Sequence, residues 1–528
     1  MQKQNSLFKR LSTTFQALSH GMIFRVGILV VAIWFVYFAI STILIPYPIE
    51  YREGAPQVLT QLLLNGENPF SISNQPLAMN NYGILYNLAA YPFVVFFGNT
   101  LSVYRSINFI LLLFIFLIIS RTAYKNGSDR YIASACGLMI VIVISSYGGF
   151  GAYPSVMGTC LFLSASLIPF RFSFTPKSLW ISAFLAVLAY YTKPYFVLSL
   201  GIVASYTFLF VSKKKALLYG FIFGLIFTSF YFPVRLIFPF YFIDTFWGNI
   251  ANVNKSFTHM CVQLLILVKD FSPMVTLAGW IAFENARSTQ KSIFLKISSF
   301  RVDVQNFNQP VFSQPLNYFA FWGLCSTLAF ILILGQHQGA YMTYAYQLIL
   351  SPLLLWLFQS INIKIYTDKI AMPLILLNVI ILSFTFLNIN FLSQRNSPEW
   401  AELYEYVSDS THILNSPVIV SAMLEHGLMP VDSGQTEYYY YIIKHPYPQS
   451  RLLGPRYSTF NTRGMEYKYS ILRMVRDKYY NRLLLTKGQE LTHGVISTVV
   501  KNYVLVNEIT VPMPQVNQNW TIEIWEPK

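Results

Sequence analysis

Long apolar runs separated by short polar segments dominate the first three-quarters of the chain. Runs of about 20 apolar residues, the length that crosses a bilayer as a helix, recur from Gly27 to Leu392. Only helices satisfy their own backbone polar groups inside lipid in this way, so the pattern predicts a polytopic α-helical membrane protein. We expect about eleven transmembrane helices, at residues 26–45, 101–120, 131–148, 154–170, 178–192, 195–212, 216–238, 262–282, 317–335, 341–358 and 370–391.

Two apolar stretches between the first two predicted spans are too short or too polar to cross the membrane. Residues 83–98 contain Asn87 and Pro92, which favours a re-entrant or interfacial helix over a span. Residues 56–65 begin with proline and carry apolar residues at helical spacing, which is typical of a short helix lying on the membrane surface. Residues 46–100 therefore form a long first loop, and we expect it to carry the catalytic groups.

From Ser393 the pattern changes to alternating helix-like and strand-like pieces. SPEWAELYEYVSDS is predicted to be a helix with Ser397 as its N-cap and Pro398 in its first turn. PVIVSAML is predicted to be a buried strand, YKYSILRMVRDKYYNRLLL a helix, and GVISTVVKNYVLVNEI and WTIEIWEP strands. We therefore expect residues 1–392 to form a transmembrane domain and residues 393–528 a soluble α/β domain.

The charge distribution gives the orientation of the spans. Charged residues are only 11% of the chain, against about 25% in soluble proteins. With the N-terminus inside, the segments between spans on the cytoplasmic side carry seventeen lysines and arginines, and the outer loops before residue 393 carry three. This positive-inside bias predicts a cytoplasmic N-terminus and a C-terminal domain on the outer face. It also accounts for the basic net charge without nucleic acid as a partner.

Several common catalytic motifs are absent from the sequence. The chain has no GxxxxGK[ST], no GxGxxG after a strand, no HExxH and no GxSxG. No part of it is therefore expected to use a nucleotide, and a donor carried by a lipid would explain that absence. The four cysteines lie in or beside apolar runs without a CxxC pair, so we expect apolar packing and neither a metal nor a cofactor.

Ionisable residues at the outer ends of the spans are the candidates for chemistry, because burying such a group without a partner is costly. Glu53 leads, because it lies in Arg52-Glu53-Gly54 just after the first span. A carboxylate at the membrane edge can act as a general base on an acceptor hydroxyl. A structural pair with Arg52 is the other interpretation, and Glu50 is the alternative base.

Three further residues have both a functional and a structural interpretation. Lys193, between two closely spaced spans, can bind a phosphate or extend to the interface as a lipid anchor. Arg105, near the start of the second span, can pair with a loop carboxylate or with a phosphate. His337, beside several tyrosines, suits a sugar or a polyprenyl headgroup, or belongs to an interfacial aromatic belt. The outer-face set also includes Glu67, Arg235, Asp244 and His259.

Short motifs along the chain match one family. The matching pieces are Arg52-Glu53-Gly54, Gly66-Glu67-Asn68-Pro69-Phe70, Tyr82-Gly83-Ile84-Leu85-Tyr86, Tyr104-Arg105-Ser106, Thr192-Lys193-Pro194 and the segment from Gly339 to Pro352. With a soluble domain after the last helix, this pattern resembles the GT-C class. These are integral membrane glycosyltransferases that use polyprenyl-phosphate sugars, such as the aminoarabinose transferases and the protein O-mannosyltransferases. Many members carry Asp, often in an Asp-Glu pair, where this chain offers Glu53 or Glu50.

The resemblance implies a mechanism and a location. The donor would be a sugar on undecaprenyl phosphate or a related lipid at the outer face of a bacterial inner membrane. The acceptor would be an envelope glycan, a lipid or a protein. Glu53 would be the base of an inverting transfer. The remaining residues that the resemblance assigns to substrate and phosphate binding are Arg52, Tyr82, Arg105, Lys193 and His337.

Two other functions stay open at this stage. An envelope polysaccharide polymerase or ligase also uses lipid-linked sugars, but such proteins tend to carry their large outer loop in the middle of the chain. A transporter would show an inverted repeat and helices broken or charged at mid-membrane. Neither pattern is clear in this sequence.

Overall fold

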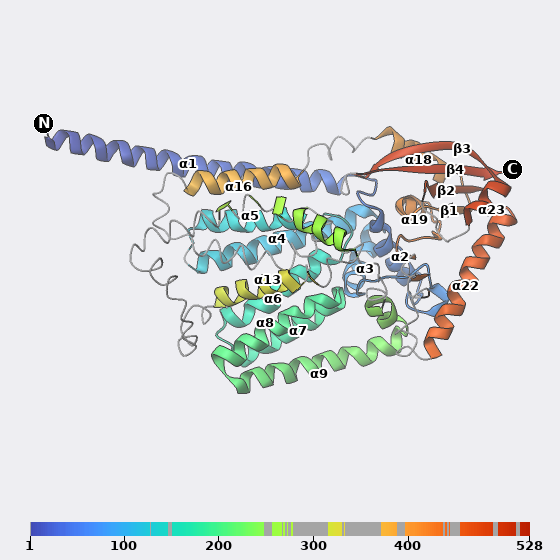
Figure 1. The fold of residues 1–528 in the computed structure, drawn as a ribbon, viewed down its shortest axis with the longest axis horizontal. Helices are drawn as coiled ribbons and strands as arrows, with labels where there is room; N and C mark the ends of the chain where they lie inside the picture. Colours follow the sequence, from blue (N-terminus) through green and yellow to red (C-terminus); the bar gives the residue numbers. More distant parts are fainter. Residues whose placement is uncertain are drawn as a thin grey trace.

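The structure is a computed structural model in which a long helical bundle is covered at one end by a small α/β unit (Figure 1). The N-terminal end of the first helix and the C-terminus lie at opposite ends of the molecule. The residues that the structure describes are 2–126, 128–145, 150–247, 256–266, 268–269, 272, 276–277, 315–329, 332, 371–387, 397–436, 439–440, 443, 455–488, 495–513 and 518–528.

The bundle consists of apolar helices that overlap the predicted spans. In chain order they are α1 (Gln2–Ile43), α4 (Leu101–Lys125), α5 (Arg130–Ser145), α6 (Ser155–Arg171), α7 (Pro176–Thr192), α8 (Leu198–Tyr206), α9 (Lys213–Ile237), α13 (Pro315–Ala329) and α16 (Ala371–Phe386). Helices α4 and α5 pack together, as do α6 and α7, and α16 packs on α1. The predicted helical membrane architecture is confirmed.

Four segments in the described part of the chain are long and apolar enough to cross a membrane, namely Gly21–Ile43, Leu101–Lys125, Pro194–Val211 and Lys213–Ile237. The other apolar helices there are shorter. The predicted span 262–282 begins in a helical stretch, Phe257–Ile266. The predicted span 341–358 lies outside the described residues. The number of eleven spans and their orientation stay predictions.

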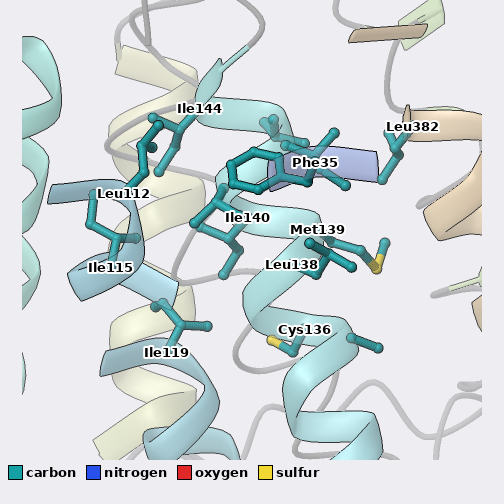
Figure 2. Close-up of a cluster of buried hydrophobic side chains, with 14 of the residues drawn as sticks. Phe35, Leu112, Ile115, Ile119, Cys136, Leu138, Met139, Ile140, Ile144 and Leu382 are labelled. Carbon is teal, nitrogen blue, oxygen red and sulfur yellow. The ribbon is translucent and has the colours of Figure 1, made fainter. Parts of the chain in front are cut away.

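The core of the bundle is an apolar cluster to which most of its helices contribute, and Figure 2 shows a part of it. Phe35 of α1, Leu112 of α4, Ile140 of α5 and Leu382 of α16 meet in it. Nearly every residue of α5 is buried, so this helix is the centre of the cluster. Cys136 lies in it with no exposed surface, which is the apolar packing expected from its sequence context.

The first loop folds into short helices and does not cross the bundle. It contains η1 (Tyr51–Glu53), α2 (Gly54–Leu64), η2 (Ile72–Asn74) and α3 (Leu85–Phe97). At 1.5 Å per residue α3 spans about 20 Å, well short of a hydrocarbon core of about 30 Å. The prediction that residues 83–98 form a short helix is confirmed. The helix expected at 56–65 begins at Gly54, because η1 runs directly into it.

The C-terminal part combines helices with a mixed sheet. Its elements are α18 (Pro398–Ser408), β1 (Ile413–Asn415), η11 (Pro417–Ile419), α19 (Val420–Glu425), α22 (Pro455–Arg476), β2 (Arg482–Thr486), α23 (Val495–Asn502), β3 (Tyr503–Met513) and β4 (Gln518–Pro527). The strand order is β1-β2-β4-β3, with β1 and β2 parallel and the other pairs antiparallel. The predicted helix at α18 and strand at β4 are confirmed.

One prediction in this part was wrong, and two were correct over only half of their length. PVIVSAML forms η11 and α19 in place of a strand, and the strand β1 comes just before it. The helix predicted through residues 467–485 ends at Arg476, and its RLLL end is β2. The strand predicted at 494–509 begins as α23. A short, fully buried apolar run has no period that separates a helix from a strand, so the tertiary contacts decide between them.

The C-terminal part docks onto the first loop through aromatic pairs and hydrogen bonds. Tyr47, just after α1, stacks on Trp400 with ring centroids 5.5 Å apart, and Tyr51 stacks on Trp520 at 5.1 Å. Helix α19 packs on α2, where the Ser421 hydroxyl hydrogen-bonds the side chain of Gln57. Aromatic pairs of this kind contribute stabilisation beyond that of the apolar area that they bury. Through these contacts the first loop is enclosed between the bundle and the sheet.

A glycine fixes how closely the first loop approaches α7. The backbone N–H of Gly83 donates to the Thr192 carbonyl at 2.7 Å. A Cβ at Gly83 would lie 1.8 Å from the Tyr191 carbonyl oxygen, closer than any real contact. This approach places Tyr82 beside Lys193, which follows Thr192.

Gly83→Ala is therefore expected to push the first loop away from α7. We expect the thermal midpoint in detergent to fall by several degrees, because the Cβ meets rigid backbone and the neighbouring packing must shift. The control is Gly224→Ala in α9, where a Cβ meets nothing within 4 Å and alanine favours the helix. Equal midpoints for the two variants would contradict this close approach.

Candidate active site

The candidate site is built around a turn that immediately follows α1. Residues 44–50 leave the helix, and Glu50 then caps η1 by accepting a hydrogen bond from the Arg52 backbone N–H at 3.0 Å. The turn places Glu50 and Glu53 three residues apart, and both are buried. Their two side chains have different partners, and that difference determines which of them is available for chemistry.

Glu53 forms a two-pronged ion pair with Arg105 of α4. Its Oε1 accepts from Arg105 Nε at 3.0 Å, and its Oε2 accepts from Arg105 Nη2 at 2.7 Å. The backbone N–H groups of Ala152 and Ile49 donate to the same two oxygens at 2.9 and 2.7 Å. Each carboxylate oxygen thus accepts two hydrogen bonds, and the side chain has no exposed surface.

The hydrogen-bond donors of Arg105 also all have partners. Its remaining donors bind the backbone carbonyls of Thr42, Ile45 and Tyr47, at the end of α1 and just beyond it. With the two bonds to Glu53, all five N–H donors of the guanidinium group have an acceptor. The pair therefore joins the end of α1, the η1 turn and α4 into one rigid unit.

Glu50 is buried in a different environment. Its Oε1 accepts from Arg52 Nε at 2.6 Å, and the Tyr153 hydroxyl donates to its Oε2. Burial raises the pKa of the Glu50 carboxyl above its ordinary value, and the Arg52 charge opposes part of that rise. A carboxylate with a raised pKa is a stronger base than an ordinary glutamate.

Lys193 lies at the C-terminal end of α7, beside the first loop. Its Nζ donates to the Ser155 hydroxyl at 2.6 Å and lies 4.2 Å from the centre of the Tyr82 ring. Burial lowers the pKa of the Lys193 ammonium well below its ordinary value, and the nearby Arg52 charge lowers it further. Two basic side chains, Arg52 and Lys193, are thus buried near each other, and their proximity disfavours the charged form of Lys193.

These residues form one group, which we call the Glu50 cluster. Its members come from the first loop, from the start of α6 and from the end of α7, and they are Glu50, Arg52, Tyr82, Tyr153, Ser155 and Lys193. Sequence reasoning named four of them and missed Tyr153 and Ser155. Their signal was available, because both stand at the start of a predicted span on the same side of the membrane as Lys193.

Solved structures with the same overall architecture are known. No family model and no curated protein matches the sequence. Two solved structures match over nearly the whole chain: ArnT from Cupriavidus metallidurans bound to undecaprenyl phosphate, and the same protein in the apo state. The TM-score is 0.59 for each, at 9% and 10% sequence identity, covering 94% of this chain and 97% of the ArnT chain.

The chain has the fold of ArnT. ArnT is an aminoarabinose transferase of the GT-C class, so the GT-C-like architecture expected from the sequence is confirmed. At this level of identity, what the two proteins share is the arrangement of their elements. The roles of individual residues are therefore argued from the contacts in this chain alone.

The other predicted residues do not join the Glu50 cluster. Asp244 is buried in a different place, where it accepts from Gln75 Nε2 at 2.6 Å, and burial raises its pKa well above the ordinary value. Glu67 and Arg235 are exposed. His337 lies outside the described residues. Within the described ranges, no group of three or more His, Cys, Asp or Glu side chains is arranged to hold a metal ion.

Glu53→Gln is expected to damage the fold, because it leaves the Arg105 charge buried without a counter-charge. Removing one partner of a buried ion pair typically costs about 3–5 kcal/mol. We expect a large fall in the thermal midpoint, measured on the purified protein in detergent by the loss of monodisperse protein after heating.

The matched control for Glu53→Gln is Glu508→Gln. It breaks the exposed pair of Glu508 with Lys487, in which the two side chains are 37% and 53% exposed. Surface pairs of this kind contribute about 0–1 kcal/mol, so the midpoint of the control should hardly move. A Glu53→Gln protein that melts with the wild type would show that the pair with Arg105 does not anchor the loop.

Proposed function

We propose that this protein is a membrane glycosyltransferase that takes a sugar from a polyprenyl-phosphate donor and transfers it to an acceptor hydroxyl. The observation that carries the proposal is a pair of buried basic residues, Arg52 and Lys193, the first of which is paired with the buried carboxylate of Glu50. The fold supports it, because ArnT, which shares this fold, has been crystallised bound to undecaprenyl phosphate.

The charges of the Glu50 cluster favour an anionic ligand. The cluster contains one carboxylate and two basic side chains, so it has an excess positive charge when Lys193 is protonated. Two buried like charges repel each other, and a phosphate between them would relieve that repulsion and restore the protonated form of Lys193. Arg52 can bind phosphate oxygens with more than one N–H group, whereas Lys193 acts as a point charge.

We propose Glu50 as the general base, out of the two glutamates that the sequence left open. Both oxygens of Glu53 are already held by Arg105 and by backbone N–H groups, so taking up a proton would break a saturated ion pair. Glu50 has the raised pKa and is paired with Arg52, whose charge also acts on Lys193. Glu53 then acts as a positioning residue that fixes the turn carrying Glu50.

The proposed reaction is a single displacement at the anomeric carbon. The acceptor hydroxyl oxygen attacks that carbon while Glu50 takes up the hydroxyl proton. The bond from the anomeric carbon to the phosphate oxygen breaks, and its electron pair stays on the lipid phosphate, whose charge Arg52 and Lys193 stabilise. The configuration at the anomeric carbon inverts. The acceptor is an envelope glycan, lipid or protein at the outer face of a bacterial inner membrane.

Glu50→Gln tests both the function and the base. General base catalysis contributes about 10²–10⁴-fold, so transfer per amount of folded protein should fall by that order. Glutamine keeps an oxygen that can accept from Arg52, and the thermal midpoint of the purified variant measures how much stability the lost charge removes. The measurement is mass analysis of envelope glycans and lipids from host cells with the gene, without it, and with the variant. The control is Glu405→Gln on the exposed face of α18, which should transfer like the wild type.

The outcomes of this comparison separate two errors. Identical envelope profiles with and without the gene would contradict the glycosyltransferase. A gene-dependent product that persists at full level in Glu50→Gln would contradict Glu50 as the base only.

Lys193→Arg tests the phosphate site through its pH dependence. The pKa of Lys193 is lowered, so the ammonium is charged at low pH and becomes neutral as the pH rises through that value. We expect the affinity of the wild type for undecaprenyl phosphate to weaken as the pH rises, relative to Lys193→Arg, because the lysine ammonium loses its charge at a lower pH than usual whereas a guanidinium group stays charged.

Comparing the two proteins at each pH removes the effect of the phosphate's own ionisation. Lys501→Arg, at an exposed position of α23, is the control and should follow the wild type. Parallel pH profiles for the wild type and Lys193→Arg would contradict a role for Lys193 in holding the phosphate.

A further inference from the structure

A short segment of the C-terminal part, residues 432–435, borders the Glu50 cluster at two points. Gly434 has a φ of +89° and packs so closely that a Cβ there would lie 3.1 Å from the Tyr51 carbonyl oxygen. Gln435 Oε1 accepts a hydrogen bond from the backbone N–H of Asn81 at 2.8 Å. Tyr51 lies between Glu50 and Arg52, and Asn81 directly precedes Tyr82. The segment thus contacts the two stretches of the first loop that carry members of the cluster, one at Glu50 and Arg52 and the other at Tyr82.

The backbone of this segment is held in place at the end of strand β1. Asn415, the last residue of β1, accepts from the N–H groups of Val431 and Asp432 at 2.6 and 3.1 Å and donates to the Asp432 carbonyl at 2.8 Å. The Asp432 carboxylate accepts from the Gly434 N–H at 2.8 Å. The conformation of residues 432–435 is therefore set by fixed partners, and its side chains are presented in defined positions.

Two side-chain atoms of this segment are buried without a hydrogen-bond partner in the described part of the chain. They are Ser433 Oγ and Gln435 Nε2, and both residues have no exposed surface. The orientation of the Gln435 amide is determined, because its oxygen must accept from Asn81. A buried polar group left unpaired costs about 1–3 kcal/mol, and folded proteins keep few of them. Two on one short segment point to a polar ligand.

We propose that Ser433 and Gln435 bind hydroxyl groups of the sugar that the polyprenyl phosphate carries. The inference rests on the proposed function and adds a recognition site to it. A sugar is bonded directly to the phosphate, so its ring would lie close to the basic residues, and the 432–435 segment contacts Tyr51 and Asn81, the chain neighbours of Arg52 and Tyr82. The Gln435 amide donates to a hydroxyl oxygen, and the Ser433 hydroxyl donates or accepts. Both groups are neutral, which suits a neutral hydroxyl, whereas a lipid tail would leave them unpaired.

The test separates binding of the sugar from binding of the phosphate. The probes are bare undecaprenyl phosphate and undecaprenyl phosphate linked to glucose, galactose, N-acetylglucosamine or aminoarabinose. Their affinities are measured on the full-length protein in nanodiscs. The variants are Ser433→Ala and Gln435→Leu, and Ser470→Ala, exposed on α22 of the same part of the chain, is the control.

We expect the wild type to bind at least one glycosylated carrier more tightly than the bare lipid. Each variant should reduce that preference about tenfold, the usual effect of losing one hydrogen bond to a ligand, and leave the affinity for the bare lipid within twofold of wild type. The thermal midpoint of Ser433→Ala without ligand should equal or exceed that of the wild type, because the substitution removes a buried unpaired hydroxyl.

Each contrary result has a defined meaning. A wild type that binds no form of undecaprenyl phosphate overturns the proposed function and this inference with it. A wild type that binds the bare lipid but prefers no glycosylated carrier overturns the sugar site alone. So do variants that keep the full preference, or that weaken bare and glycosylated carriers equally, since equal weakening reports a structural role.

Discussion

The ion pair between Glu53 and Arg105 is the constraint on which the rest of the site depends. Removing two charges from water is costly, and only a saturated set of partners offsets that cost. Here every N–H of the Arg105 guanidinium donates a hydrogen bond, and three of them donate to carbonyls at and beyond the end of α1. The Glu53 carboxylate accepts from Arg105 and from the backbone N–H groups of Ile49 and Ala152. Because breaking any one of these contacts would leave a buried polar group without a partner, α1, α4 and the η1 turn stay in a single arrangement.

That arrangement places Glu50 and Arg52 where they meet Lys193. The two residues stand on the turn that Glu53 fixes, and Lys193 comes from α7, which reaches the first loop through the close approach at Gly83. The result is two cations and one carboxylate with little access to water. Electrostatic interactions are stronger in such a setting than at a surface, which is why we propose that the cluster binds a phosphate and stabilises the charge that develops on it.

The C-terminal part completes the enclosure of this cluster. Stacked aromatic pairs attach it to residues on either side of Glu50, and the 432–435 segment lies against the backbone of the same turn. The α/β unit thus borders a site whose charged residues come from the helical part. In the proposed function, the residues that bind the lipid phosphate and those that bind the attached sugar belong to two different parts of the chain.

The sequence by itself determined the helical membrane architecture, the short helices of the first loop and most members of the charged cluster. Run length, proline placement and the charges between spans are local features, and the physics of lipid acts on them directly. It favoured Glu53 as the base, with Glu50, three residues before it, as the alternative. Only the tertiary structure shows that the two carboxylates have different partners, because Arg105, 52 positions away, meets Glu53 and not Glu50, and our proposal of Glu50 rests on that difference. The same reason explains PVIVSAML, whose apolar residues suit a buried helix or a buried strand equally until packing against α2 makes it a helix.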